Sequence, residues 1–158
     1  MKNIEKKKKK EFDTWGEKEY GAILMKFQYS DGGRSLYFSG VAGDCVTRAF
    51  SIGLGKSYLE LYELVNKISQ LERTDMKIKS NRKKKNISSA CGGVYPNTIK
   101  KLAYHFGLKF NSKTGKIKNL KGRNYLVLLQ EHMTCIRDGI MIDTHDCSDL
   151  EYIGYYEL

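Results

Sequence analysis

Cys45 stands directly behind a glycine-rich turn and ahead of an apolar run, in the stretch GVAGDCVTRAF at 40–50. The turn and Asp44 predict that a helix begins here and runs to about Leu54, where Gly55 ends it. Cys45 then lies in the first turn of the helix, where unpaired backbone N–H groups and the helix dipole favour negative charge. The position therefore favours a thiolate nucleophile; a small core residue, half of a disulfide and a metal ligand are the alternatives.

The segment HMTCIRDGIMIDTH at 132–145 is typical of a β-hairpin that turns at Asp138-Gly139. With a two-residue type I′ turn, one face of the hairpin carries the side chains of His132, Thr134, Ile136, Met141, Asp143 and His145. Asp143 is the diagonal neighbour of His132, at a backbone separation of roughly 7–8 Å that side chains can span. A carboxylate that holds one imidazole nitrogen leaves the other to take a proton from a thiol. Cys45, His132 and Asp143 are the predicted catalytic residues, with Asp146 as the alternative third member.

The other cysteines are expected to be inert. Cys91 precedes two glycines, Cys135 lies mid-strand on the face opposite His132, and Cys147 lies in a loop. The four cysteines lack a CxxC spacing, and the chain is long enough to fold without disulfides, so we expect reduced thiols. Metal binding by His132, His145 and Cys147 is disfavoured, because consecutive side chains at 145–147 do not converge easily on one ion. We predict no metal and no cofactor.

The net charge of +10 at pH 7 is concentrated in two runs, at 1–10 and at 77–85. Such runs are usually solvated, disordered segments. Clustered basic side chains also bind phosphates by releasing counterions, without regard to nucleic-acid sequence, and neither run has interleaved aromatic residues that would stack on bases. The predicted contacts for nucleic acid or another partner are Lys77, Lys79, Arg82, Lys83, Lys84 and Lys85.

Helices are expected first along the chain and strands last. The helices are predicted at about 44–54, at 58–72 with Ser57 as its cap, and at about 97–106 with Asn97 as its cap. The strands are predicted at 124–130, in the hairpin at 132–145 and at 150–158, and SDGGR at 30–34 is expected to join two extended segments. This order indicates an α+β fold in which N-terminal helices pack on a C-terminal antiparallel sheet.

The domain organisation expected from composition is simple. A disordered basic tail at 1–11 precedes a single domain at 12–158, which contains a basic loop at 74–88. The charged start lacks the apolar stretch of a signal peptide, and no apolar run approaches the roughly 20 residues of a membrane span. We therefore expect a cytoplasmic protein, and its oligomeric state is left open.

In this combination the sequence resembles papain-like cysteine peptidases, in which a helix-start Cys is followed by a strand-start His and by an Asp or Asn on the neighbouring strand. The bacteriocin-processing peptidase domains of export transporters share this layout, including an Asp directly before the Cys, as Asp44 is here. Residues 27–158 more closely resemble small proteins encoded by phages and mobile elements. The matching stretches are YSDGGR, GVAGDCVTRAF, GKSYLELYELVN, SSACGGVY, KGRNYLVLLQEHMTCIRDGIMIDTHDCS and YIGYY.

The resemblance implies a thiol hydrolase (peptidase, isopeptidase or deamidase) or an acyltransferase that acts on a protein or peptide in the cytoplasm of a bacterial host. The alternative is a catalytically inactive papain-like scaffold that binds nucleic acid or a host protein through its basic segments.

One position departs from the peptidase pattern. The Gln expected six residues before the Cys, which completes the oxyanion hole, is Ser39 here. Loss of one oxyanion donor typically costs about a hundredfold to a thousandfold in rate. Ser39, Arg34 and Ser89 are the candidate replacements, and Asp44 is a supporting residue that pairs with Arg48 at (i, i+4).

Overall fold

The structure is a computed structural model that describes residues 25–40, 42–79 and 88–158, without the side chains of 73–79. The predicted tail at 1–11 and the predicted contacts Arg82, Lys83, Lys84 and Lys85 lie outside the described residues. So do the side chains of Lys77 and Lys79. The predicted basic loop at 74–88 begins as helix, because the helix that precedes it continues to Lys79.

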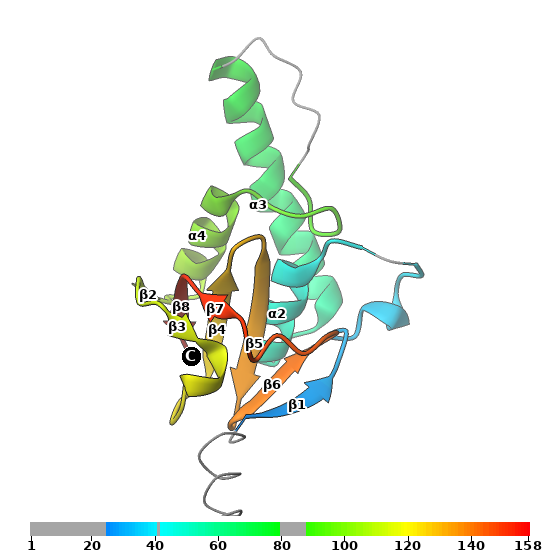
Figure 1. Ribbon diagram of the computed structural model, residues 1–158. Coiled ribbons are helices and arrows are strands. Elements are labelled where there is room, and N and C mark those ends of the chain that lie inside the picture. Colours follow the sequence, from blue (N-terminus) through cyan, green and yellow to red (C-terminus); the bar gives the residue numbers. More distant parts are fainter. Residues whose placement is uncertain (1–24, 41, 80–87) are drawn as a thin grey trace, which may run out of the picture.

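The described chain is α+β, as predicted, with helices that cover one face of a mixed six-stranded sheet (Figure 1). The helices are α2 (Cys45–Leu54), α3 (Tyr58–Lys79) and α4 (Pro96–His105), and short 3-10 turns are η1 (Arg34–Leu36) and η2 (Ile117–Asn119). The strands are β1 (Lys26–Tyr29), β2 (Phe110–Asn111), β3 (Gly115–Lys116), β4 (Tyr125–Leu129), β5 (His132–Arg137), β6 (Ile140–Asp143), β7 (Glu151–Tyr152) and β8 (Gly154–Glu157).

The strand order of the main sheet is β1-β6-β5-β4-β8-β2. The prediction of a purely antiparallel C-terminal sheet is wrong at one edge, where β1 pairs with β6 in parallel. Parallel pairing needs a long connection between the strands, and here most of the chain lies between β1 and β6. Such a pairing between distant segments leaves no local signal in the sequence.

The β5–β6 hairpin has the predicted register. Cys135 faces Ile142, and Arg137 faces Ile140. Asp138 and Gly139 both have positive φ, at 52° and 74°, which is the backbone that a type I′ turn requires. The turn therefore fixes which side chains of the hairpin share a face.

Other predictions needed correction. Extended chain lies on only one side of SDGGR. Strand β1 precedes the segment, whereas η1 begins at its last residue, Arg34. The Asp31 carboxylate causes this, because it accepts bonds from the backbone N–H groups of Gly33 (2.9 Å) and Ser35 (3.0 Å) and winds the chain. Asn97 is not a helix cap: α4 begins at Pro96 with Tyr95 as its N-cap, since proline is well suited to a first helical position.

Two apolar cores lie on the two faces of the sheet. The core under the helices includes Phe50, Leu61, Leu102, Leu126 and Cys135. The opposite core contains residues of η2 and β7 and includes Ile117, Val127, Ile136, Met141 and Tyr155. Alternate residues of β4 and β5 supply both cores, so these central strands are buried on both sides. None of the described helices combines the length and apolar character of a membrane span.

Candidate functional site

Cys45 is the first residue of α2 and is half-buried. The helix begins here because the glycine-containing segment before it changes the chain direction at Asp44, its N-cap residue. Gly55 ends the helix in the left-handed conformation, with φ of 63°. The thiol therefore lies at the helix N-terminus, where the sequence predicted it.

His132 begins β5, and Asp143 ends β6 on the neighbouring strand. The Nε2 atom of His132 lies 2.7 Å from Oδ2 of Asp143, so the diagonal pair of the hairpin is in direct contact. The other carboxylate oxygen, Oδ1, accepts a hydrogen bond from the backbone N–H of Thr144 at 2.7 Å. Burial alone would raise the pKa of Asp143, but the hydrogen bonds from His132 and from the backbone N–H of Thr144 lower it.

Burial would raise the pKa of the Cys45 thiol, but hydrogen bonding with the His132 side chain, the imidazole charge and the backbone N–H of Met133 lower it. Burial would likewise lower the pKa of His132, but its bonds to Asp143, Cys147 and Cys45 raise it well above the usual value. The two shifts have opposite signs, and both favour the thiolate–imidazolium form of the pair.

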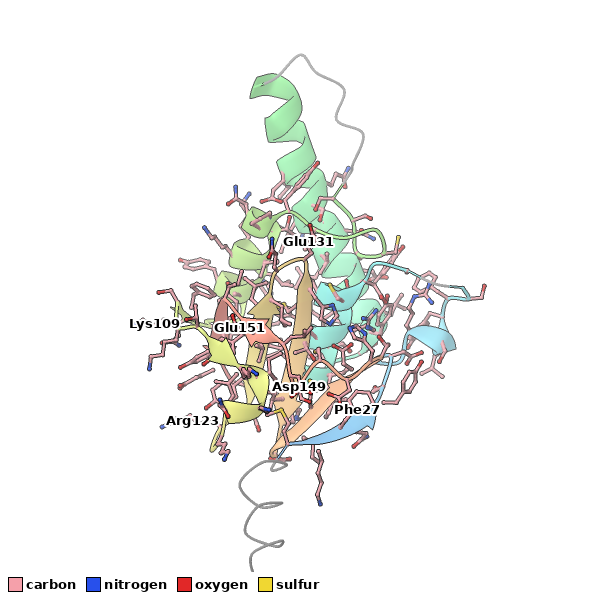
Figure 2. The ribbon with its side chains drawn as sticks, viewed as in Figure 1. Phe27, Lys109, Arg123, Glu131, Asp149 and Glu151 are labelled. Atoms are coloured by element: carbon pink, nitrogen blue, oxygen red, sulfur yellow. The ribbon has the colours of Figure 1, made fainter. Side chains whose placement is uncertain are left out.

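A cleft of about 940 Å³ opens beside Cys45 and His132. Its wall is largely apolar and comes from α2, α4, β4, β5, β8 and the segment before α4; it includes Val46, Val94, Ile99, Leu128, Met133 and Tyr156. Polar groups at its boundary include Lys100, His145 and Glu131. Figure 2 shows Glu131 at the turn between β4 and β5. The volume and lining suit a medium-sized, mainly apolar ligand whose reacting end reaches the thiol.

A network of buried charges lies behind the thiol. Asp44 pairs with Arg48, as the (i, i+4) spacing predicts, and also accepts a hydrogen bond from the Tyr58 hydroxyl at 2.6 Å. The Nε atom of Arg34 is 3.4 Å from Asp44 Oδ2. Arg48 in turn lies 3.5 Å from Asp143, so the charges connect the helix start to the His132–Asp143 pair.

The structure does not bring every predicted site residue to the cleft. Arg34 donates to the carbonyls of Ser39 and Gly40, and its guanidinium holds the segment that leads to α2. Ser39 is exposed, and the Ser89 hydroxyl accepts the backbone N–H of Gly92 at 2.9 Å. Neither serine nor Arg34 lines the cleft. Asp146 is exposed and accepts the N–H of Ser148, so Asp143 is the carboxylate that meets the histidine.

The remaining cysteines occupy different surroundings, and all four thiols are free. Cys91 is exposed, and Cys135 is fully buried, where burial raises its pKa to about 12. Cys147 is buried beside His132, a contact that the prediction of an inert loop thiol missed. The loop after β6 turns back toward the sheet, and strand periodicity does not encode that return.

His132, Asp143 and Cys147 present possible ligand atoms within 4.8 Å of one another. Zinc ligands lie about 2.0–2.3 Å from the ion in tetrahedral geometry, which separates two ligand atoms by more than 3 Å. The 2.7 Å contact between His132 and Asp143 is shorter and is a direct hydrogen bond. The described geometry is therefore that of a hydrogen-bonded pair.

Comparison with protein families finds a match to the GON domain over residues 19–110, more than half of the chain. The chain belongs to the GON domain family. No curated protein and no solved structure matches it. The GON match contains Cys45 and the described helices, whereas His132 and Asp143 lie on strands that follow it.

The GON match overturns the resemblance inferred from the sequence. The assignment to papain-like cysteine peptidases or to small phage-encoded proteins is wrong. The papain-like thiol hydrolase or acyltransferase derived from it, and the alternative of a papain-like scaffold that binds nucleic acid or a host protein, are withdrawn with it. The cytoplasmic location, the protein or peptide partner and non-specific nucleic-acid binding through the basic segments stay predictions.

Proposed function

We propose that this GON-family chain carries a nucleophilic thiolate, Cys45, that forms a covalent adduct with an electrophilic ligand bound in the adjacent cleft. The observation that carries the proposal is that Cys45 and His132 line the same cleft, with His132 held by Asp143 at 2.7 Å. The proposal keeps only the predicted spatial arrangement, in which a cysteine at a helix start faces strands of the C-terminal half. It assumes no relationship to papain-like peptidases.

The proposed step is an addition. The thiolate lone pair of Cys45 forms a bond to an electrophilic carbon of the ligand, and a ligand π bond breaks. The electron pair of that π bond moves toward a ligand oxygen, and the His132 imidazolium donates its proton to the ligand. Asp143 keeps the imidazole oriented and stabilises its charged form. The thiol is added across the π bond with no leaving group and no further reactant.

The cleft supports an apolar ligand. Burial of apolar surface contributes about 25 cal/mol per Å², so a chain that lies along the aliphatic wall gains affinity that a small polar electrophile lacks. The wall residues Val46 and Met133 adjoin Cys45 and His132 in sequence, which supports a ligand whose reacting end lies at Cys45.

Labelling with acrylamide and N-octylacrylamide near neutral pH tests the proposal, with each cysteine followed by peptide mass spectrometry. Cys45 should react faster than the exposed Cys91, and the octyl chain should accelerate labelling of Cys45 but not of Cys91. Exposure alone would favour Cys91, so it is the internal reference. Faster reaction of Cys91, or an equal effect of the octyl chain on both thiols, would contradict the proposal.

A further inference from the structure

The carboxylate of Asp44 has an unusual partner for its position. Asp44 is the N-cap residue of α2, where an aspartate side chain ordinarily accepts a backbone N–H from the first turn. Its side chain makes no capping bond. Both carboxylate oxygens are used elsewhere, one by Arg48 and the other by the Tyr58 hydroxyl. The negative charge at the helix start is therefore directed to Arg48.

Arg48 reaches from this helix start to the end of β6. One terminal nitrogen, Nη1, binds Asp44, and the other, Nη2, lies 3.5 Å from Oδ1 of Asp143 and 3.4 Å from the Thr144 hydroxyl. The residue is 8% exposed, and its Nε finds no hydrogen-bond acceptor among the described residues. Burial of an N–H donor without an acceptor costs free energy of folding. The contacts with the two carboxylates offset this cost and hold the guanidinium in place.

These contacts form one path of alternating charge. Arg48 joins the helix that begins at Cys45 to the carboxylate of Asp143, and Asp143 holds His132. A change in the bridge moves the start of α2 relative to β5 and β6. It therefore changes the geometry between sulfur and imidazole without removing either group.

We propose that Arg48 is a positioning residue that sets the alignment of Cys45 with His132 by bridging Asp44 and Asp143. The inference rests on the proposed nucleophilic function of Cys45 and adds a residue that acts on it through the carboxylates. A planar guanidinium suits this role, because its separate N–H groups bind two carboxylates at once. A lysine ammonium keeps the charge but has no such fork.

The Arg48→Lys variant separates geometry from charge. Its N-octylacrylamide labelling rate at Cys45 should fall by roughly tenfold or more at a pH where the thiol is fully ionised, because misplacement by about 1 Å costs up to a hundredfold. The pH midpoint of labelling should stay near that of the wild type, because the positive charge remains. A Lys variant with the wild-type maximal rate would overturn the inference.

Arg137→Lys is the matched control. Arg137 also joins β5 to α2, through a bond from its Nη1 to the Ile52 carbonyl at 3.0 Å, but at the other end of the helix. Labelling of Cys45 should be unchanged in this variant. A loss equal to that of Arg48→Lys would mean that any weakened helix–strand contact suffices, and it would refute the specific role of Arg48.

A double variant, Asp44→Asn with Arg48→Met, guards against a folding defect, since it removes both members of the buried pair. If its circular dichroism and thermal unfolding match the wild type, slow labelling of Cys45 at a pH where the thiol is fully ionised reports lost positioning, and wild-type labelling refutes it. The two proposals fail differently. If wild-type Cys45 is no faster than Cys91, the proposed function fails; if wild-type Cys45 is fast and Arg48→Lys is equally fast, only the role of Arg48 fails.

Discussion

The two ends of the interface between α2 and β5 each carry a thiol, and the pKa values of these two thiols shift in opposite directions. At the N-terminal end, Cys45 contacts His132 and the N–H of Met133, and its pKa is lowered. At the C-terminal end, burial raises the pKa of Cys135 to about 12. Gly53 lies so close to the sheet there that an added Cβ would come 2.6 Å from a Leu126 methyl and 3.4 Å from the Cys135 sulfur.

The difference teaches that burial does not decide the state of a cysteine. Burial opposes the thiolate at both ends. At Cys45 the His132 side chain and a backbone N–H outweigh it, whereas at Cys135 burial outweighs the charge of Arg137. One end of the interface is built for close packing and the other for a charge pair. The two ends should therefore respond independently to mutation.

The largest effect is expected from a cavity at the apolar end. Leu126→Ala removes a fully buried side chain and should lower the free energy of unfolding by about 2–5 kcal/mol, as measured by urea denaturation. The pH midpoint of Cys45 labelling should stay unchanged. Leu71→Ala, at a leucine that is 64% exposed, is the control and should cost less than about 0.5 kcal/mol. A shifted midpoint in Leu126→Ala would show that the ends are coupled.

The next effect is expected at the polar end. His132→Ala removes the cation beside Cys45 and should slow labelling at mildly acidic pH by roughly tenfold, because a thiol of ordinary pKa is mostly protonated there. Labelling of Cys91 should not change. An unaltered Cys45 rate would mean that the imidazole does not activate the thiol.

A smaller effect is expected in the pH dependence of stability. The lowered pKa of Asp143 stabilises the fold above the unfolded-state value and is lost as pH falls, while the raised pKa of His132 stabilises it below the unfolded-state value and is lost as pH rises. Asp143→Asn should therefore cost about 1 kcal/mol, mainly between about pH 4 and pH 6.5. Urea denaturation from below pH 4 to well above pH 6.5 measures it, and a loss that is the same inside and outside this window would contradict the ion pair.

The parts of the site that the sequence could predict are those with local signals. The turn residues Asp138 and Gly139 determine the register of the hairpin and hence the approach of Asp143 to His132. The glycine-rich segment before Cys45 and Gly55 after the helix define α2. These signals are backbone preferences of single residues, so they survive without knowledge of the fold.

The rest depends on contacts between distant segments. No periodic pattern in the sequence predicts that β1 pairs in parallel with β6. The same holds for the approach of Cys147 to His132. The bridge from Arg48 to Asp143 joins a helix to a strand, although its local half, Asp44 with Arg48, could be predicted from spacing alone. The order of Cys, His and Asp along the chain does not predict the family, because it constrains the geometry of a site and not its ancestry.

The ultraviolet absorbance of the Cys45 thiolate tests the central claim most directly. The absorbance of the wild-type chain minus that of Cys45→Ser, followed as pH is raised from acid to alkaline values, gives the ionisation of this one thiol. We predict a midpoint below the value of about 8.5 for an ordinary cysteine, because His132 and the N–H of Met133 stabilise the thiolate. A midpoint at or above the ordinary value would contradict the account.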